Sequence, residues 1–129
     1  MHLHAALITA LNIVLIAVAM SLVGRARGRF QIKAPATTGN LEFERVFRAH
    51  QNTLEQTIMF LPVLWLATVY GHEQYASWLG YAWLAGRAWY LVGYVRPTGR
   101  RDGGFLVAIL AWFCLLVLSF YGLLPRLLA

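Results

Sequence analysis

Four long apolar segments, joined by short polar links, constrain this chain more than any other feature of its sequence. They predict four α-helices, over residues 3–23, 41–69, 76–94 and 105–124. A helix of about 20 apolar residues crosses the roughly 30 Å hydrocarbon core of a bilayer. Composition agrees, because 60% of the residues are hydrophobic and only 12% are charged, against about a quarter charged in soluble domains. The predicted fold is an all-α integral membrane four-helix bundle that forms one domain over residues 1–129.

Capping residues and helix breakers set the predicted ends of the first two helices. Gly24 and the arginines after it are expected to stop the first helix, and residues 28–39 to form a loop at the membrane surface. Asn40 is the predicted N-cap of the second helix. Glu42 and Glu44 lie in its first turn, where the helix dipole favours negative charge.

Prolines set the remaining predicted features. Pro62 is expected to kink the second helix, and the pair at residues 96–97 to end the third. Residues 99–104 read as a basic turn, and the fourth helix is expected to end at Pro125. In the first helix, Asn12 is expected to form a hydrogen bond to another helix.

The net charge of +6 is concentrated in two links. The link between the first and second helices and the link between the third and fourth hold eight of the cations: Arg25, Arg27, Arg29, Lys33, Arg45, Arg96, Arg100 and Arg101. Cations confined to links form no soluble basic face, which argues against nucleic acid as a partner. The positive-inside rule predicts cytoplasmic basic links and termini on the opposite side. Short loops favour a bacterial inner membrane over the endoplasmic reticulum.

Polar residues of the second and third helices fall on single helical faces. At 100° per residue, five of them lie within about 100° of one another: Glu44, Arg48, Gln51, Asn52 and Glu55. On the third helix, Arg87, Tyr90 and Tyr94 share one face. If the two faces met, they would form a pocket for a zwitterionic, amide-bearing ligand. Structural ion pairs, interhelical hydrogen bonds and interface anchors explain the same residues, and both interpretations stay open. The histidines lack metal-ligand spacing, so no metal site is predicted.

Residues 43–55, FERVFRAHQNTLE, closely resemble the E-R-V-x-R-A-H-x-N-x-x-E signature of the MAPEG family, the membrane-associated proteins of eicosanoid and glutathione metabolism. The resemblance covers nearly the whole chain, because the TTG link at residues 37–39 and residues 86–101 also match members of the family. It implies a homotrimer with a glutathione site at each subunit interface, open toward the basic side.

The resemblance also implies residue roles in glutathione binding. Arg48, Asn52 and Glu55 match positions that hold the γ-glutamyl end, where Glu55 suits the ammonium and Arg48 the carboxylate. Tyr90 and Tyr94 match aromatic contacts to the peptide.

Further matches concern the other end of glutathione and its sulfur. Arg27 matches an arginine near the glycyl carboxylate, and His50 a position that reaches glutathione from a neighbouring subunit. Arg101 matches the catalytic arginine that stabilises the thiolate, with the adjacent Arg100 as an alternative. Gln56 stands where leukotriene C4 synthase has tyrosine, which argues against that specific synthase.

The implied activity is that of a membrane-bound glutathione transferase, with peroxidase activity as a further use. Glutathione would be the co-substrate, activated as a thiolate, and the lipophilic electrophile would arrive from the bilayer, with no metal involved. One alternative is a non-catalytic lipid-binding scaffold of the same family. Another is a small four-helix drug exporter, but such exporters carry a membrane glutamate in the first helix, and residues 3–23 contain no acid.

Overall fold

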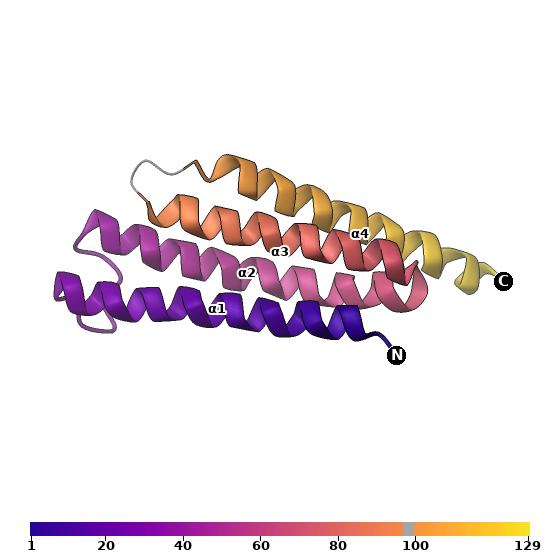
Figure 1. Ribbon diagram of the computed structural model, residues 1–129, viewed down its shortest axis with the longest axis horizontal. Helices are drawn as coiled ribbons and strands as arrows, with labels where there is room; N and C mark the ends of the chain where they lie inside the picture. Colours follow the sequence, from indigo (N-terminus) through magenta and orange to yellow (C-terminus); the bar gives the residue numbers. More distant parts are fainter. Residues whose placement is uncertain (97–99) are drawn as a thin grey trace.

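The computed structural model describes residues 1–96 and 100–129, and within them the chain folds into four α-helices and no strand. The helices are α1 (Leu3–Phe30), α2 (Leu41–Tyr70), α3 (Glu73–Val95) and α4 (Asp102–Leu128). Figure 1 shows them running back and forth along one long axis, with α1 and α4 on opposite sides of the α2–α3 pair. The predicted all-α four-helix bundle is confirmed.

Helix α1 is longer than the sequence predicted. It passes through Gly24 and ends at Phe30, so the predicted stop at Gly24 is wrong. One glycine costs a helix only about 1 kcal/mol, and the alanines and arginines around it are good helix formers. The helix ends where Gln31 adopts a left-handed conformation, with φ 58°. Arg27 Nη1 then donates to the carbonyl oxygen of Ala36 at 2.7 Å, which holds the following loop against the helix end.

Helix α2 begins as predicted. Asn40 Oδ1 accepts hydrogen bonds from the backbone N–H groups of Glu42 at 2.9 Å and Phe43 at 3.1 Å, which confirms the N-cap. The Glu44 carboxylate accepts a hydrogen bond from the Gly39 backbone N–H at 3.0 Å. The Asn40 contacts satisfy N–H groups that a helix start otherwise leaves unpaired, and the Glu44 contact holds the residue that precedes the cap.

Two prolines lie inside helices. Helix α2 continues through Pro62 as far as Tyr70. Helix α4 continues through Pro125 as far as Leu128, so the predicted end at Pro125 is wrong. Proline in the last turn removes a single N–H bond there, and the remaining three residues keep the helical conformation.

The other boundaries differ from the predictions by a few residues. Helix α3 begins at Glu73, directly after a short connection from α2, rather than at residue 76. Helix α4 begins at Asp102, inside the basic turn predicted over residues 99–104. Gly99 of that turn lies outside the described residues, as does Pro97 of the predicted stop.

The core lies between α2 and α3 and is covered on its two sides by α1 and α4. It contains a parallel stack of the buried Phe60 and Trp83 rings, whose centroids are 3.7 Å apart. The predicted interhelical hydrogen bond of Asn12 is confirmed, because its buried Nδ2 lies 3.2 Å from Thr57 Oγ1. Small residues allow α3 and α4 to approach closely. A Cβ at Gly104 would lie 2.6 Å from the carbonyl oxygen of Gly86.

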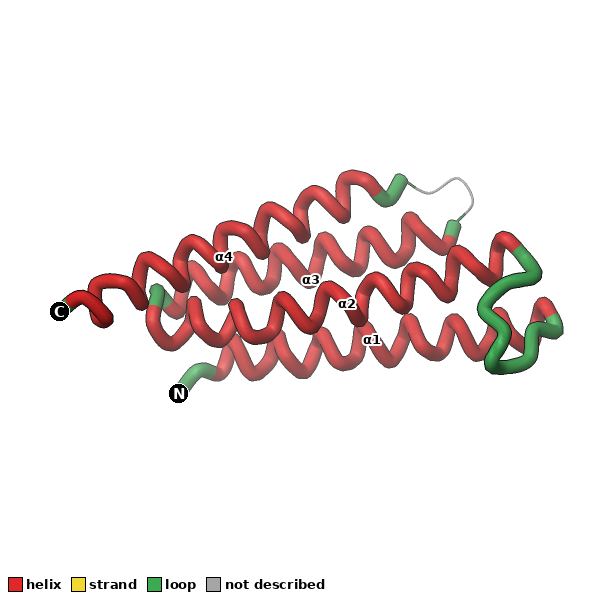
Figure 2. The backbone as a smooth tube through the Cα atoms, turned by 180° about the vertical axis from the view of Figure 1, so that it is seen from behind, coloured by secondary structure: helices red, strands yellow, loops and turns green. Residues whose placement is uncertain are grey.

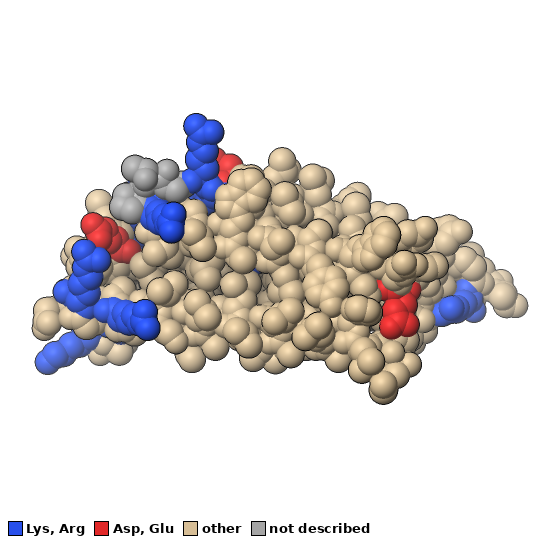
Figure 3. Space-filling view, viewed as in Figure 1, with Lys and Arg blue, Asp and Glu red and all other residues tan. Residues whose placement is uncertain are grey.

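The surface between the two ends is apolar, as a bilayer requires. Helices α1, α2 and α4 are long and apolar enough to cross a membrane. Helix α3 does not reach the same hydropathy, although its 23 residues span about 35 Å and it packs on α2 and α4. Figure 2 shows both chain termini at the end of the bundle opposite the two long connections. In Figure 3 most of the Lys and Arg side chains lie at the end with those connections. The chain is an integral membrane protein.

Candidate functional site

The predicted polar faces of α2 and α3 meet inside the bundle. The two helices are antiparallel, and their alignment places Asn52 opposite Arg87. Arg87 Nη2 donates to Asn52 Oδ1 at 3.1 Å and to Thr53 Oγ1 at 2.8 Å. These bonds fix the Asn52 amide with its oxygen toward Arg87, so its Nδ2 group points elsewhere.

Arg87 is completely buried, about 12 Å along α3 from the helix end at Val95. Its Cζ lies 4.1 Å from the centroid of the Tyr90 ring. Among the described residues, its Nε and Nη1 atoms have no hydrogen-bond partner. A buried cation with unmet donors is costly in apolar surroundings and is a strong attractor for an anion.

Aromatic rings connect Arg87 to the basic end of the bundle. The centroids of Tyr90 and Tyr94 are 5.3 Å apart, and the Arg101 guanidinium carbon lies 4.3 Å from the Tyr94 centroid. Tyr90 is buried, with 6% of its surface exposed, whereas Tyr94 is half-buried and Arg101 is exposed. A continuous series of contacts therefore runs from Asn52 inside the bundle to Arg101 at its surface.

The outer part of the site is a second group on α2. Arg48 Nη1 lies 3.6 Å from Glu55 Oε1, and about half of each side chain is exposed. Arg48 and Tyr94 line a common cavity of about 400 Å³, together with Thr37, Leu41, Glu44, Arg45 and Phe47. This cavity places a cation and a phenol beside the helix surface that carries the Arg48–Glu55 pair.

Arg27 and His50 lie apart from these contacts within one chain. The Arg27 guanidinium donates to loop carbonyl groups and stacks over Phe43, with 5.0 Å between Cζ and the ring centroid. His50 is half-buried on a different face of α2. No hydrogen bond or ion pair in the described part of the chain joins either residue to Arg48, Asn52 or Glu55.

Residues 1–96 and 100–129 contain no group of three or more His, Cys, Asp or Glu side chains that could hold a metal ion. The charged groups that the described site does hold are two carboxylates and four guanidinium groups, those of Glu44, Glu55, Arg45, Arg48, Arg87 and Arg101. Such a set suits an anionic or zwitterionic organic molecule.

A profile of the MAPEG family matches residues 5–123. The chain belongs to the MAPEG family. It is 46% identical to an uncharacterized protein of Synechocystis over 87% of this chain and 82% of that relative. It is 41% identical to microsomal glutathione S-transferase 2 of Mus musculus, over 81% of this chain and 71% of the relative. It is 39% identical to leukotriene C4 synthase of Cavia porcellus, over 94% of this chain and 81% of the relative.

In this MAPEG chain, the resemblance alone did not predict the hydrogen bonds of Arg87 and Thr53. Arg87 shares the predicted polar face of α3, but its contacts to Asn52 and Thr53 appear only when the helices are packed. A signal for Arg87 was present, because it is the one cation in an otherwise apolar stretch of α3. Thr53 gave no such signal, because threonine is common on buried helix faces of membrane proteins.

Proposed function

We propose that this MAPEG protein is a membrane glutathione transferase that conjugates glutathione to lipophilic electrophiles. The observation that carries the proposal is the connected series Asn52–Arg87–Tyr90–Tyr94–Arg101, beside the Arg48–Glu55 pair. These groups match the charges of glutathione, which carries an ammonium, two carboxylates and a thiol. The similarity to microsomal glutathione S-transferase 2 supports the same substrate.

The Arg48–Glu55 pair suits the γ-glutamyl end of glutathione. A half-exposed ion pair contributes only about 0–1 kcal/mol, so a ligand displaces it at little cost. The α-amino acid group carries the complementary pair of charges. Arg48 would bind its carboxylate and Glu55 its ammonium, with charge-assisted hydrogen bonds replacing the 3.6 Å contact.

Asn52 and the tyrosines would hold the peptide backbone. Because Arg87 occupies the Asn52 oxygen, the Asn52 Nδ2 group is left to donate to a peptide carbonyl. Tyr94 is the more accessible of the two phenols and lines the cavity with Arg48. Tyr90 would act mainly by fixing Arg87 and Tyr94 through its ring contacts.

Arg101 is the residue we assign to the chemistry. A cysteine-type thiol has a pKa of about 8.5, and the thiolate is the nucleophile. A guanidinium at the sulfur stabilises the anion and lowers that pKa. Arg101 is the N-cap residue of α4, so the positive end of the α4 dipole adds to its charge. The thiol proton passes to water, and the thiolate attacks the electrophilic carbon to form a C–S bond. Either the bond from that carbon to a leaving group breaks and the group departs with the electron pair, or a C=C bond opens and the resulting anion takes a proton from water.

Arg27 and His50 would complete the site from a neighbouring subunit. Neither residue forms a hydrogen bond or ion pair with Arg48, Asn52 or Glu55 in the described part of the chain, which supports a role in the site of another subunit. We propose a homotrimer in which Arg27 lies near the glycyl carboxylate and His50 reaches the bound peptide. The basic end would face the cytoplasm of a bacterium, from which glutathione enters, while the electrophile arrives through the bilayer.

The test is an ultraviolet difference titration of the detergent-solubilised protein with glutathione at neutral pH. We expect a saturable thiolate absorption band that is lost in Arg101→Ala and retained in Arg126→Ala, which removes a cation from the other end. The Arg100→Ala variant decides between the adjacent arginines. A protein that binds no glutathione by calorimetry and shows no band contradicts the proposal and favours a non-catalytic lipid-binding scaffold.

A further inference from the structure

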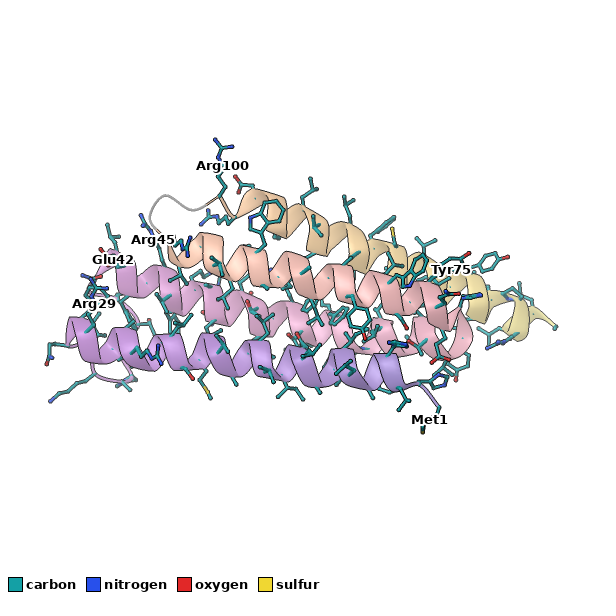
Figure 4. The ribbon with its side chains drawn as sticks, in the orientation of Figure 1. Met1, Arg29, Glu42, Arg45, Tyr75 and Arg100 are labelled. Carbon is teal, nitrogen blue, oxygen red and sulfur yellow. The ribbon has the colours of Figure 1, made fainter. Side chains whose placement is uncertain are left out.

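A second polar cavity lies at the end of the bundle that carries the chain termini. It has a volume of about 630 Å³, and its lining includes His4 of α1 and His72, Glu73, Gln74, Trp78 and Tyr81 at the start of α3. Figure 4 labels Tyr75 of this region at one end of the molecule and Arg45 and Arg100 at the other. The cavity is therefore separate from the proposed glutathione site.

Contacts between α1 and α3 hold the cavity in shape. His4 Nδ1 lies 3.0 Å from the Tyr81 hydroxyl oxygen, and the two rings meet edge to face. His2 Nδ1 lies 3.1 Å from Glu73 Oε2. These contacts join the start of α1 and its cap residue to the first three turns of α3, so the polar groups are positioned before any ligand arrives.

The cavity has the chemistry of a site for an ammonium group. Glu73 is its one carboxylate, and 42% of that side chain is exposed. Trp78 and Tyr81 supply aromatic faces, which attract alkylammonium groups. Gln74 and His72 offer N–H donors for a phosphate next to that ammonium.

An apolar groove adjoins this cavity. It lies between α3 and α4, with a volume of about 760 Å³, and its lining includes Leu79, Ala82, Phe113, Cys114 and Val117. Trp78 lines both the groove and the polar cavity. The polar cavity and the apolar groove therefore match the headgroup and the acyl chain of an amphiphilic molecule.

We propose that these two spaces bind one phospholipid with a zwitterionic, ammonium-bearing headgroup. The ammonium lies against Glu73, Trp78 and Tyr81, the phosphate lies near Gln74 and His72, and one acyl chain follows the groove past Trp78. Charge selects this lipid over an anionic one, because no described residue lining either space is Lys or Arg, and Glu73 repels a second negative charge.

Cys114 provides the measurement, because it is the only cysteine of the chain, is exposed and lines the groove. The full-length protein is delipidated in a maltoside detergent, and its alkylation by N-ethylmaleimide is timed while lipid is added. Phosphatidylcholine should slow the reaction at least fivefold at saturation. Phosphatidylglycerol with the same acyl chains should give half-maximal protection only at a concentration at least fivefold higher than phosphatidylcholine requires. Free phosphocholine, which lacks acyl chains, should give no protection.

Variants separate the headgroup cavity from the groove. Glu73→Gln should abolish the preference for phosphatidylcholine, whereas Glu42→Gln, which removes a carboxylate from the other end, should keep it. Ala82→Phe fills the groove and should remove protection by both lipids while the chain stays folded. Equal protection by both lipids in the parent protein overturns the proposal. So does an unchanged preference in Glu73→Gln, protection by free phosphocholine, or a Cys114 that resists alkylation without lipid because another subunit covers it.

Discussion

The end of the bundle with the two long connections differs from the end with the chain termini in the burial of its charge. At the basic end, polar contacts continue inward from the exposed Arg101 to the fully buried Arg87. At the other end, the contacts of His2, His4 and Glu73 remain at the surface. Burying a cation among helices costs free energy that a surface contact avoids. Among the described residues, Arg87 is the one buried charged side chain, and the contacts that reach it start at the basic end, as expected for a site that holds a charged substrate.

The largest expected effect at the basic end concerns Arg101. Arg101→Ala should lower kcat about 100-fold while the KM for glutathione changes little, because one charged group that stabilises a reacting anion contributes about 10²–10³ in rate. Steady-state kinetics with a lipophilic electrophile measures both constants. Arg126→Ala, which removes the cation that lies 5.6 Å from the Tyr70 ring at the other end, is the matched control. Equal losses in both variants would break the distinction between the two ends.

The second prediction concerns the buried cation. Arg87→Met removes the hydrogen bonds to Asn52 and Thr53, so Asn52 is no longer held in one orientation. The Kd for glutathione should rise about 10-fold, or about 1.4 kcal/mol. Unfolding stability should change less than expected for a lost buried group, because the variant also removes an uncompensated charge.

Calorimetry and thermal unfolding measure the two effects of Arg87→Met separately. Arg87→Lys keeps the charge without the planar fork and should bind glutathione with intermediate affinity. Arg29→Met, at the exposed end of α1, serves as the matched loss of a cation. An unchanged Kd in Arg87→Met would show that the buried guanidinium serves only the packing of α2 against α3.

A smaller effect is expected at the half-exposed ion pair. Glu55→Gln should raise the KM for glutathione about threefold to tenfold and leave kcat nearly unchanged, because the ammonium it binds does not react. Without substrate, a double-mutant cycle with Arg48→Gln should give a coupling free energy below about 1 kcal/mol. Glu42→Gln controls for the loss of one carboxylate from α2. A large fall in kcat for Glu55→Gln would contradict the assignment to binding.

The smallest expected effect concerns helix capping rather than chemistry. Asn40→Ala removes two hydrogen bonds to the start of α2 and should lower the unfolding free energy by about 1 kcal/mol. Tyr81→Phe removes one exposed contact at the opposite end and should cost less. Thermal unfolding in detergent ranks the two variants, and the reverse order would show that the terminal end is the more firmly held of the two.

The sequence predicted the fold well where local chemistry decides it. The Asn40 cap, the Asn12 hydrogen bond and the four helices follow from short patterns or from apolar length. It failed at Gly24 and Pro125, where neighbouring residues carry the helix past a breaker. A rule about single residues misses this cooperativity, because each added helical residue gains a hydrogen bond that offsets the local cost.

The candidate site was predictable in part. Helical spacing placed Arg48, Asn52 and Glu55 on one face, and the family signature gave them roles. The opposition of Asn52 and Arg87 depends on how α2 and α3 are aligned, which no local pattern specifies. A site between subunits also depends on how the chains assemble, which no local sequence pattern specifies. The roles of Arg27 and His50 therefore remain predictions.

The length of α2 sets the height of the site relative to the lipid. Its 30 residues extend about 45 Å, which exceeds the hydrocarbon core by about 15 Å, or about ten residues. If about the last 20 residues of α2 fill the core, Arg48 stands in the headgroup layer while Asn52 and Glu55 lie just below its edge. Hydrophobic mismatch would therefore act directly on the proposed glutathione site. A thicker bilayer would submerge the Arg48–Glu55 pair and a thinner one would lift it into water, so membrane thickness becomes a determinant of glutathione affinity.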